Sequence, residues 1–453
     1  MLRADAGETT RARIGTGRGR WTRAGLGVVV LATLGGVTMS TSPPGSAAVS
    51  IPTRGVVTVT MATVGDPGNP SVGVIQTFGG PKGQFVDPPA NQGSTGIYKS
   101  CADAPAGPPP CLTVGQVNYT YGIGEFDVTV SQYVTFLNTV DPRGKNVHDL
   151  YDDDMSPTVW PKYGSVRYTP SAPTSQHYAV AYPQWANKPF NFGDFRRAAR
   201  FANSLTNGKV LSKTSSSSGT FTYVTYKVRL STRTETGMYT VANPATTRHR
   251  STGFVIPSNN EWVKAAYYDP TGGGTDSYWA YPTGPFNQPN VAILNPGTGD
   301  VENASDQPLA TYNPNDPDSA VDTPGAPAGA APTWCPYQAG STCDKVFPAD
   351  IPQGLDLPSQ YMANVSTVGQ DKTPSPWGTY DQGGNVVEIL DTLAPQPPGY
   401  NFLRDWRYYH GGVANAPAYQ MEISAFGYNP GNPELQHIYP WYGFRVGVIG
   451  NLK

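Results

Sequence analysis

Glycine and proline make up about a fifth of this chain, and that share limits how much regular structure it can form. The sequence holds 51 glycines and 45 prolines among 453 residues. Glycine loses the most backbone freedom on ordering, and proline lacks the N–H that helices and sheets need. Hydrophobic residues still make up 38% of the chain, which is enough for a folded core. The sequence therefore predicts a globular protein with short helices and strands joined by many loops.

Charged residues are scarce and nearly balanced. They make up 14% of the chain, and the formal net charge is -2. No basic block favours nucleic acid, and no acidic tail favours a cationic partner. We expect no nucleic-acid partner.

The N-terminus has the layout of an export signal. Five arginines between residues 11 and 23 precede an uncharged, largely apolar stretch at 24–39, and small residues up to Ala48 offer a cleavage site. The stretch is short for a membrane span, although an uncleaved anchor is the alternative. We predict a signal peptide over residues 1–48 and a secreted or extracytoplasmic mature protein. No second apolar stretch follows, so we expect no membrane segment after cleavage.

Four cysteines fit an exported protein. Cys101 and Cys111 flank an Ala/Pro-rich loop, and Cys335 and Cys343 flank a Gly/Ser/Thr loop. Pairing within each couple is the simplest of three connectivities. A reactive or metal-binding thiol pair is the alternative, but neither couple is C-x-x-C and no histidine is near. We predict two local disulfides.

Three segments have the patterns of helices. Thr129 or Ser131 can cap the first, which carries an apolar stripe at i, i+3, i+4 and i+7. The second runs over about 193–206. The third begins at Ser258 and Glu261, which have the spacing of a capping box.

Strand patterns are shorter. Val56 to Thr60 alternates in the manner of an edge strand, and Phe221 to Val228 also predicts a strand. The serines at 215–219 predict the turn before it.

Long Pro/Gly-rich stretches interrupt these patterns. We predict insertions near 80–112 and 297–360, because loops of this length are unusual inside a compact domain. No clean linker separates two halves of the chain. We therefore expect one domain over residues 49–453, decorated by long loops.

Five blocks occur in a fixed order along the chain. Together they resemble the signature of the formylglycine-generating enzyme family (sulfatase-modifying factors), with one block reading S-P-W-G-T-Y-D-Q-G-G-N-V. The resemblance implies an α+β fold that is related to C-type lectins, low in regular secondary structure and rich in long loops. The five blocks are Tyr121–Asn138, Gln184–Leu205, Ile256–Pro270, Ser375–Val386 and Gly443–Val446.

The resemblance fails where the family keeps its chemistry. Two cysteines of the family bind copper(I), activate oxygen and oxidise a cysteine of a client sulfatase. Counted from the pair Gly411-Gly412, they correspond here to Ala416 and Met421, and no cysteine follows Cys343. Soft thiolates select copper(I), and neither replacement supplies one. We expect no bound copper and no standard formylglycine-generating activity.

The resemblance also implies a structural calcium ion. The family holds it with an Asn/Asp side chain, two backbone carbonyls and a Glu spaced 0, 3, 5 and 7. Here that spacing gives Asp381, Gly384, Val386 and Glu388. Carboxylate and carbonyl oxygens suit calcium. The alternative is that the two acidic residues only cap turns.

Two functional classes remain open. The main hypothesis is an exported recognition scaffold whose ligand is a peptide or a carbohydrate, because aromatic residues crowd the C-terminal segment and can form a binding surface. The alternative is a copper- or other metal-dependent oxidase with relocated catalytic residues. Its candidate residues are Cys335, Cys343 and His410.

Overall fold

The computed structural model describes most of the chain from residue 55 on. From Ser50 the chain forms one compact unit. The predicted signal peptide and the predicted disulfide Cys335–Cys343 lie outside the described residues, and the domain boundaries stay a prediction. The described residues are 55–75, 97–98, 100–104, 111–160, 163–243, 245–272, 277–285, 288–294, 300–312, 365–394, 406–414, 416, 418–430 and 440–452.

Short helices and strands of several sheets make up the described part of the chain. The helices are α1 (Val130–Val140), α2 (Phe195–Thr206) and α3 (Asn259–Tyr267). The larger sheet has the order β10 (Gly253–Val255), β17 (Gly447–Ile449), β5 (Tyr121–Gly124), β1 (Val56–Val64), β9 (Phe221–Arg229) and β8 (Lys209–Ser218). A second sheet has the order β15 (Phe426–Pro430), β14 (Trp406–His410), β13 (Val387–Leu393) and β16 (Tyr442–Gly443).

Three small sheets complete the described structure. The first is β3 (Ile97–Tyr98), β2 (Val72–Ile75) and β4 (Cys111–Val114). The other two are the pairs β6 (Val166–Tyr168) with β7 (Tyr178–Val180), and β11 (Asn290–Val291) with β12 (Leu309–Ala310).

Side-chain caps start all three helices where the sequence predicts them. Thr129 caps α1 in a full capping box with Gln132, so the first of the two predicted caps is the one used. Asp194 caps α2 by accepting from the N–H of Arg197. Ser258 and Glu261 form the predicted capping box of α3. Each cap satisfies an N–H that would otherwise lack a partner at the helix start.

Two of the strand predictions are wrong in their details. β1 lies between β5 and β9, so it is a central strand and not an edge strand. The serines from Ser215 to Ser218 do not form a turn, because they continue β8 and pair with β9 as far as Phe221. They are all exposed on the outermost strand of the sheet, where polar side chains are tolerated, and the chain reverses only at Gly219, which has φ +58°.

An aromatic cluster joins α1, α2 and the C-terminal segment. The ring of Tyr133 stacks on Phe190 with 3.6 Å between centroids. Phe444 meets Phe190 and Phe201 edge-on at 6.1 and 5.7 Å. Edge-on and stacked pairs are favourable arrangements of aromatic rings. The G-F-R-V block near the C-terminus therefore anchors the last strands to the helices.

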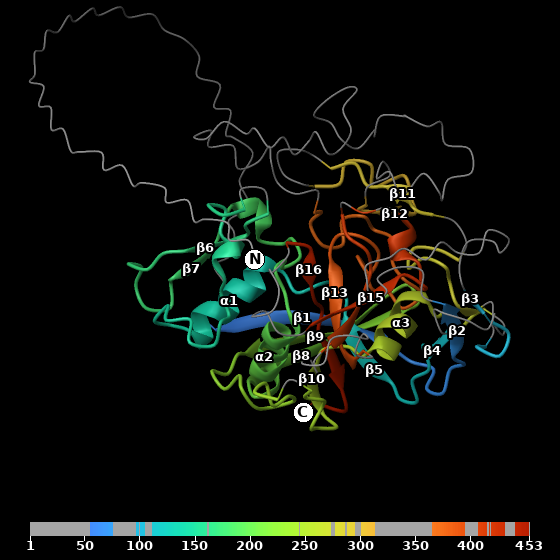
Figure 1. Ribbon diagram of the computed structural model, residues 1–453, viewed down its shortest axis with the longest axis horizontal. Helices are drawn as coiled ribbons and strands as arrows, with labels where there is room; N and C mark the ends of the chain where they lie inside the picture. Colours follow the sequence, from blue (N-terminus) through green and yellow to red (C-terminus); the bar gives the residue numbers. More distant parts are fainter. Residues whose placement is uncertain are drawn as a thin grey trace, which may run out of the picture. The chain divides into compact units, whose positions relative to one another are not determined.

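The helices flank the sheets on two sides. In Figure 1, α1 and α2 lie to the left of β13 and α3 lies to its right, while β11 and β12 lie above. α2 packs on β10 and β13, and α3 packs on β13 and β4. This is an α+β arrangement with long loops, as predicted. In the part of the chain that the structure describes, no helix has the length and apolar character that a membrane crossing requires.

Candidate functional site

Packed apolar side chains occupy the two positions that the sequence resemblance predicts for the family's cysteines. Ala416 is 6% exposed and follows the glycine pair at 411–412. Met421 is 1% exposed and ends the short 3-10 helix η6 (Ala418–Met421). Neither side chain supplies a thiolate, and Met421 contributes to hydrophobic packing. Its cluster comprises Ala280, Tyr281, Ala310, Tyr312, Ala418 and Met421.

His410 is a buried packing residue in this structure. Its ring stacks on Trp262 with 4.8 Å between centroids, and its Nε2 lies 2.8 Å from Oδ1 of Asn259. Because an amide oxygen only accepts, Nε2 carries the proton. Burial lowers the pKa of His410 to about 3, so the ring is neutral at physiological pH. A buried neutral imidazole is poorly suited to exchange protons with a substrate in solution.

A fully buried ion pair lies next to Trp262, the residue on which His410 stacks. Arg445 donates to both carboxylate oxygens of Glu388, with Nε–Oε2 at 2.5 Å and Nη2–Oε1 at 2.6 Å. The indole Nε1 of Trp262 donates to Oε2 at 2.8 Å. All three side chains are essentially shielded from solvent. A two-point Arg–carboxylate pair of this kind is strong and fixes geometry.

Two further carboxylates lie close to this pair. Asp127 lies 3.6 Å from Nη2 of Arg445, and neither of its oxygens has a hydrogen-bond partner among the described residues. Asp381 accepts from the N–H of Gly369 at 2.6 Å through Oδ2, while its buried Oδ1 receives no hydrogen bond from the described residues and its carboxyl group lies beside that of Asp371. Burial is the main cause that raises the pKa of both carboxyl groups well above the usual range. Unpartnered buried carboxylate oxygens are what a bound cation would satisfy.

The predicted calcium ligands are Asp381, Gly384, Val386 and Glu388, and two of them differ in how their oxygens are already used. Asp381 has the unpartnered Oδ1. Glu388 accepts three hydrogen bonds, and since each carboxylate oxygen has two lone pairs, its Oε1 keeps one free. Gly384 lets the backbone approach closely, because a Cβ there would lie 2.1 Å from the carbonyl oxygen of Thr311. Among the described residues no three His, Cys, Asp or Glu converge on a metal position, but a site of two carboxylates and two carbonyls needs no such triad. The calcium site stays a prediction.

Lys188 is a buried lysine that no sequence pattern singles out. It is 0% exposed, and its Nζ donates to the carbonyl of Val365. Burial lowers its pKa to about 7, although Asp300 opposes the effect. A neutral lysine can act as a nucleophile, but this one is shielded from solvent and hydrogen-bonded to backbone. Its role in this structure is to hold the segment at 365.

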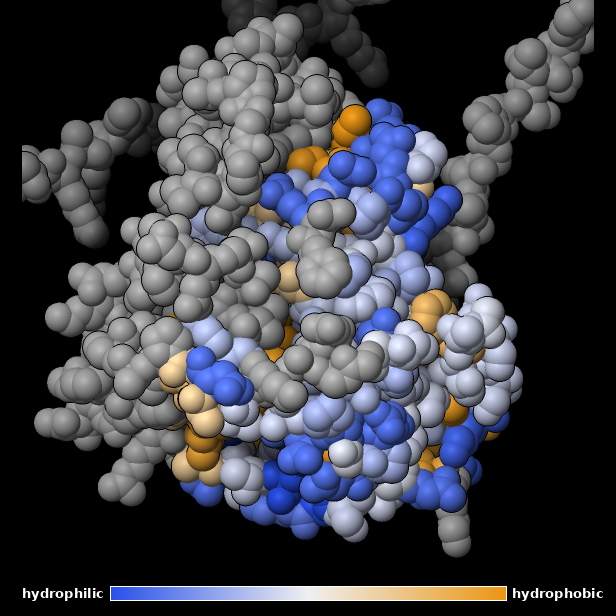
Figure 2. All heavy atoms as spheres, turned by 90° about the vertical axis from the view of Figure 1, so that its right-hand side faces the viewer, coloured by the Kyte–Doolittle hydropathy of each residue, from blue (hydrophilic) through white to orange (hydrophobic). Residues whose placement is uncertain are grey.

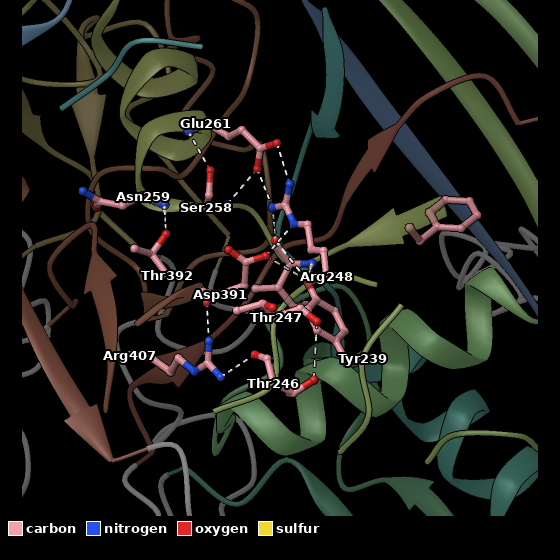
Figure 3. A network of polar contacts seen from close by, with 12 residues as sticks. Tyr239, Thr246, Thr247, Arg248, Ser258, Asn259, Glu261, Asp391, Thr392 and Arg407 are labelled. Carbon is pink, nitrogen blue, oxygen red and sulfur yellow. Dashed lines mark hydrogen bonds and ion pairs between the residues drawn. The ribbon is translucent and has the colours of Figure 1, made fainter. Parts of the chain in front are cut away.

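Arg248 joins two buried carboxylates from distant parts of the chain (Figure 3). Its Nη1 and Nη2 donate to Glu261 at 2.8 and 2.6 Å, and its Nε donates to Asp391 at 2.5 Å. Burial alone would raise the pKa of Glu261, but Arg248 brings it below its usual value. For Asp391 burial prevails, so the pKa is raised. The network ties the capping glutamate of α3 to β13. No local motif signals it, because Asp391 lies 143 residues from Arg248 in the sequence.

A cavity of about 550 Å³ lies beside this network. The N–H of Asn259 donates to Oγ1 of Thr392 at 2.8 Å on its wall (Figure 3). All its lining side chains are neutral, so it offers no charged anchor. They are Leu112, Thr113, Val114, Ser258, Asn259, Asn260, Thr392, Leu393, Ala394 and Tyr408.

A second cavity, of about 530 Å³, is lined by aromatic rings and hydroxyl groups. We call it the aromatic groove. The groove residues are Thr63, Gly65, Thr220, Phe221, Thr222, Asp269, Pro270, Thr271, Trp279, Pro374, Ser375, Pro376 and Trp377.

The molecular surface is mixed in character on the face that Figure 2 shows. Outside the grey atoms, hydrophilic and weakly polar residues cover most of this face, and hydrophobic residues are scattered among them.

The cysteines that the structure describes form the predicted local disulfide. Cys101 and Cys111 are bonded, with 5.5 Å between their Cα atoms. The bridge links the start of β4 to the residues that follow β3. Cys335 and Cys343, the candidates for relocated catalysis, lie outside the described residues.

The family model for the sulfatase-modifying factor enzyme 1-like domain matches residues 110–448. The chain therefore belongs to the family of sulfatase-modifying factors, the formylglycine-generating enzyme family that its sequence blocks resemble. The family and the α+β fold are confirmed. The match says nothing of the activity of this member.

Two solved structures are similar to this chain over most of its length. Variable protein 1 of Treponema denticola shares 15% identity, with a TM-score of 0.39, over 88% of this chain and 98% of its own. PvdO from Pseudomonas aeruginosa shares 13% identity, with a TM-score of 0.36, over 87% of this chain and 94% of its own. No curated protein matches the chain.

Removal of Arg445 tests whether the buried ion pair supports the fold. We expect Arg445→Met to lower the free energy of unfolding by about 3–5 kcal/mol, because Glu388 is left buried and unpaired. The double variant Arg445→Met/Glu388→Gln should lose less than the single variant. Urea unfolding measures both. The control is Arg200→Met, whose partner Glu235 is 38% exposed, with an expected loss of about 0–1 kcal/mol. If Arg445→Met and Arg200→Met lowered the free energy of unfolding by the same small amount, the buried ion pair would not support the fold.

The lowered pKa of Lys188 predicts a pH dependence of stability. Between about pH 7 and its usual value of 10.5, the unfolded chain holds a proton on Lys188 that the folded protein lacks. Stability linked to this group therefore rises with pH in that window. We expect the wild type to gain stability relative to Lys188→Met between pH 7 and 9.5 in denaturant titrations. Lys209→Met, at an exposed lysine, should show no such difference in slope. If the stability of the wild type and of Lys188→Met changed equally with pH, the pKa of Lys188 would not be lowered.

Proposed function

We propose that this protein is an exported recognition scaffold of the sulfatase-modifying factor family that does not convert cysteine to formylglycine. One observation carries the proposal. At the positions that the resemblance predicts for the family's two thiols, Ala416 and Met421 are both buried, and Met421 belongs to an apolar cluster. Copper(I) chemistry of the family's kind needs two thiolates at that place.

The residues around these positions support a role in folding and not in redox chemistry. Tyr267 donates its hydroxyl to the carbonyl of Met421 at 2.9 Å, and the N–H of Ile423 donates to the carbonyl of Ala280 at 3.0 Å. His410 is neutral and packed on Trp262. The segment is thus held by backbone contacts and packing, which suits a rigid scaffold. We propose that the ligand is a peptide or carbohydrate, recognised at a cavity and not at a redox centre.

A structural calcium ion is part of the proposal. Asp381, Glu388 and the carbonyls of Gly384 and Val386 would hold it at the start of β13. Calcium would satisfy the unpartnered Oδ1 of Asp381 and stabilise the turn, and it would take no part in a reaction.

The absence of formylglycine formation is tested with a substrate peptide. The mature protein is incubated with copper(I), a reductant and a peptide carrying the sulfatase motif C-x-P-x-R, and aldehyde is sought by mass spectrometry. We expect no aldehyde, because Ala416 and Met421 supply no thiolate pair at the predicted position of the family's cysteines. The disulfide Cys101–Cys111 also removes two of the remaining thiols. A formylglycine-generating enzyme with its cysteine pair serves as the positive control. Turnover by the wild type would overturn the proposal, and its loss in Cys335→Ser would place the chemistry at the relocated cysteines.

Calcium binding is tested by melting curves with and without chelator. A ligand that binds only the folded state adds about 2.7 kcal/mol at a hundredfold excess over its Kd. We expect a chelator to lower the Tm of the wild type and to leave the Tm of Asp381→Ala unchanged. Asp153→Asn, in an acidic run elsewhere in the chain, is the matched control and should respond like the wild type. A wild-type Tm that ignores the chelator would remove the site.

A further inference from the structure

The aromatic groove is assembled from four separate parts of the chain. Thr63 and Gly65 lie at and just after the end of β1, and Thr220 to Thr222 span the turn after β8 and the first residues of β9. The other two parts are the residues after α3 and the loop 374–377. At about 530 Å³ it falls in the range of roughly 300–1,000 Å³ typical of small-molecule sites.

Internal hydrogen bonds fix the loop that forms one wall. The hydroxyl of Tyr223 donates to the carbonyl of Gly378 at 3.0 Å. The N–H of Gly378 donates to the carbonyl of Ser375 at 3.0 Å, and the hydroxyls of Ser375 and Thr379 lie 2.7 Å apart. Gly378 has φ +81°, a backbone conformation that favours glycine. The wall is therefore built before a ligand arrives, which reduces the entropy that binding must overcome.

Three aromatic rings line the groove without stacking on one another. Phe221, Trp279 and Trp377 are each only partly buried. Trp377 lies against the backbone of Gly65, since a Cβ there would be 3.5 Å from its Cζ3. Phe221 lies against Gly378 in the same way, with Cγ 2.6 Å from the position of a Cβ. Trp377 and Phe221 are thus held in place by backbone contacts, and all three rings keep partly exposed surface for a ligand.

Hydroxyl groups and one carboxylate share the groove with the rings. Asp269 accepts from the N–H and the hydroxyl of Thr271 at 2.8 and 2.7 Å, both through Oδ1. Its Oδ2 receives no hydrogen bond from the described residues. None of the lining residues is Lys or Arg, so the groove does not favour an anion. The hydroxyl-bearing lining residues are Thr63, Thr220, Thr222, Thr271 and Ser375.

We propose that the aromatic groove binds a neutral carbohydrate. The C–H face of a sugar ring packs on an aromatic ring, and its hydroxyls both donate and accept. Oδ2 of Asp269 would accept from a sugar hydroxyl, and threonine hydroxyls would pair with others. An organic cation would use the rings and the carboxylate but not the hydroxyls. The inference rests on the proposed function, because it gives the ligand class of the recognition scaffold.

The test is titration of the purified mature protein with neutral oligosaccharides of glucose, galactose, mannose and N-acetylglucosamine, read by calorimetry and by saturation-transfer NMR. We expect at least one to bind. Trp377→Ala and Trp279→Ala should each weaken binding about tenfold, because each removes an aromatic surface. Asp269→Asn keeps an acceptor for Thr271 and should weaken binding less. The matched control is Trp160→Ala, a partly buried tryptophan outside the groove, which should bind like the wild type.

Melting curves establish that each variant is folded before its binding is interpreted. Failure of every oligosaccharide to bind, or unchanged binding in both folded tryptophan variants, would overturn the inference. So would binding of choline or of a proline-rich peptide in the groove with no sugar bound. Failure of this inference can be distinguished from failure of the proposed function. Aldehyde formation would overturn that proposal whatever the groove binds, whereas absent sugar binding without aldehyde would overturn the groove assignment alone.

Discussion

The pair of Arg445 and Glu388 is the contact on which the C-terminal half depends. Besides Glu388 on β13, the guanidinium donates to the carbonyl of Gly124 at 2.9 Å and to that of Tyr380 at 3.0 Å. The buried guanidinium of Arg445 therefore joins the end of β5, the start of β13 and the loop before β13. Burying a charge is unfavourable unless it is fully paired, and this one has a partner for nearly every N–H. The G-G-N-V-V-E and G-F-R-V blocks are thus two halves of one interaction.

That arrangement holds the fold together without a thiol at the predicted positions of the family's cysteines. The chain next to the glycine pair is held by Trp262, which donates to Glu388 and stacks on His410. Around Met421 the space is filled by apolar side chains. None of these contacts requires a thiol or a copper ion. We propose that this member of the family has lost the redox centre and kept its scaffold, and that the aromatic groove serves recognition.

Local chemistry made part of the structure predictable from sequence. A cap at Thr129 or Ser131 and the capping box at Ser258 predicted two helix starts correctly, and the short cysteine spacing predicted the disulfide Cys101–Cys111. Strand order was not predictable. Alternation of apolar and polar residues shows that one face of a strand is buried, but it does not show how many strands pair with it. The prediction of an edge strand was therefore wrong for β1.

Contacts between distant segments also left little trace in sequence. Lys188 reaches a carbonyl 177 residues away, Arg248 reaches Asp391, and the groove gathers residues from four segments.

We propose that packed side chains have replaced a reactive centre around Met421. Thiol labelling of Met421→Cys measures whether this position is closed to solvent. The labelled peptide is read by mass spectrometry, with Val159→Cys at a 49% exposed position as the reference. We expect Met421→Cys to label far more slowly than Val159→Cys in native buffer and at a similar rate in urea. Equal labelling rates in native buffer would contradict this proposal.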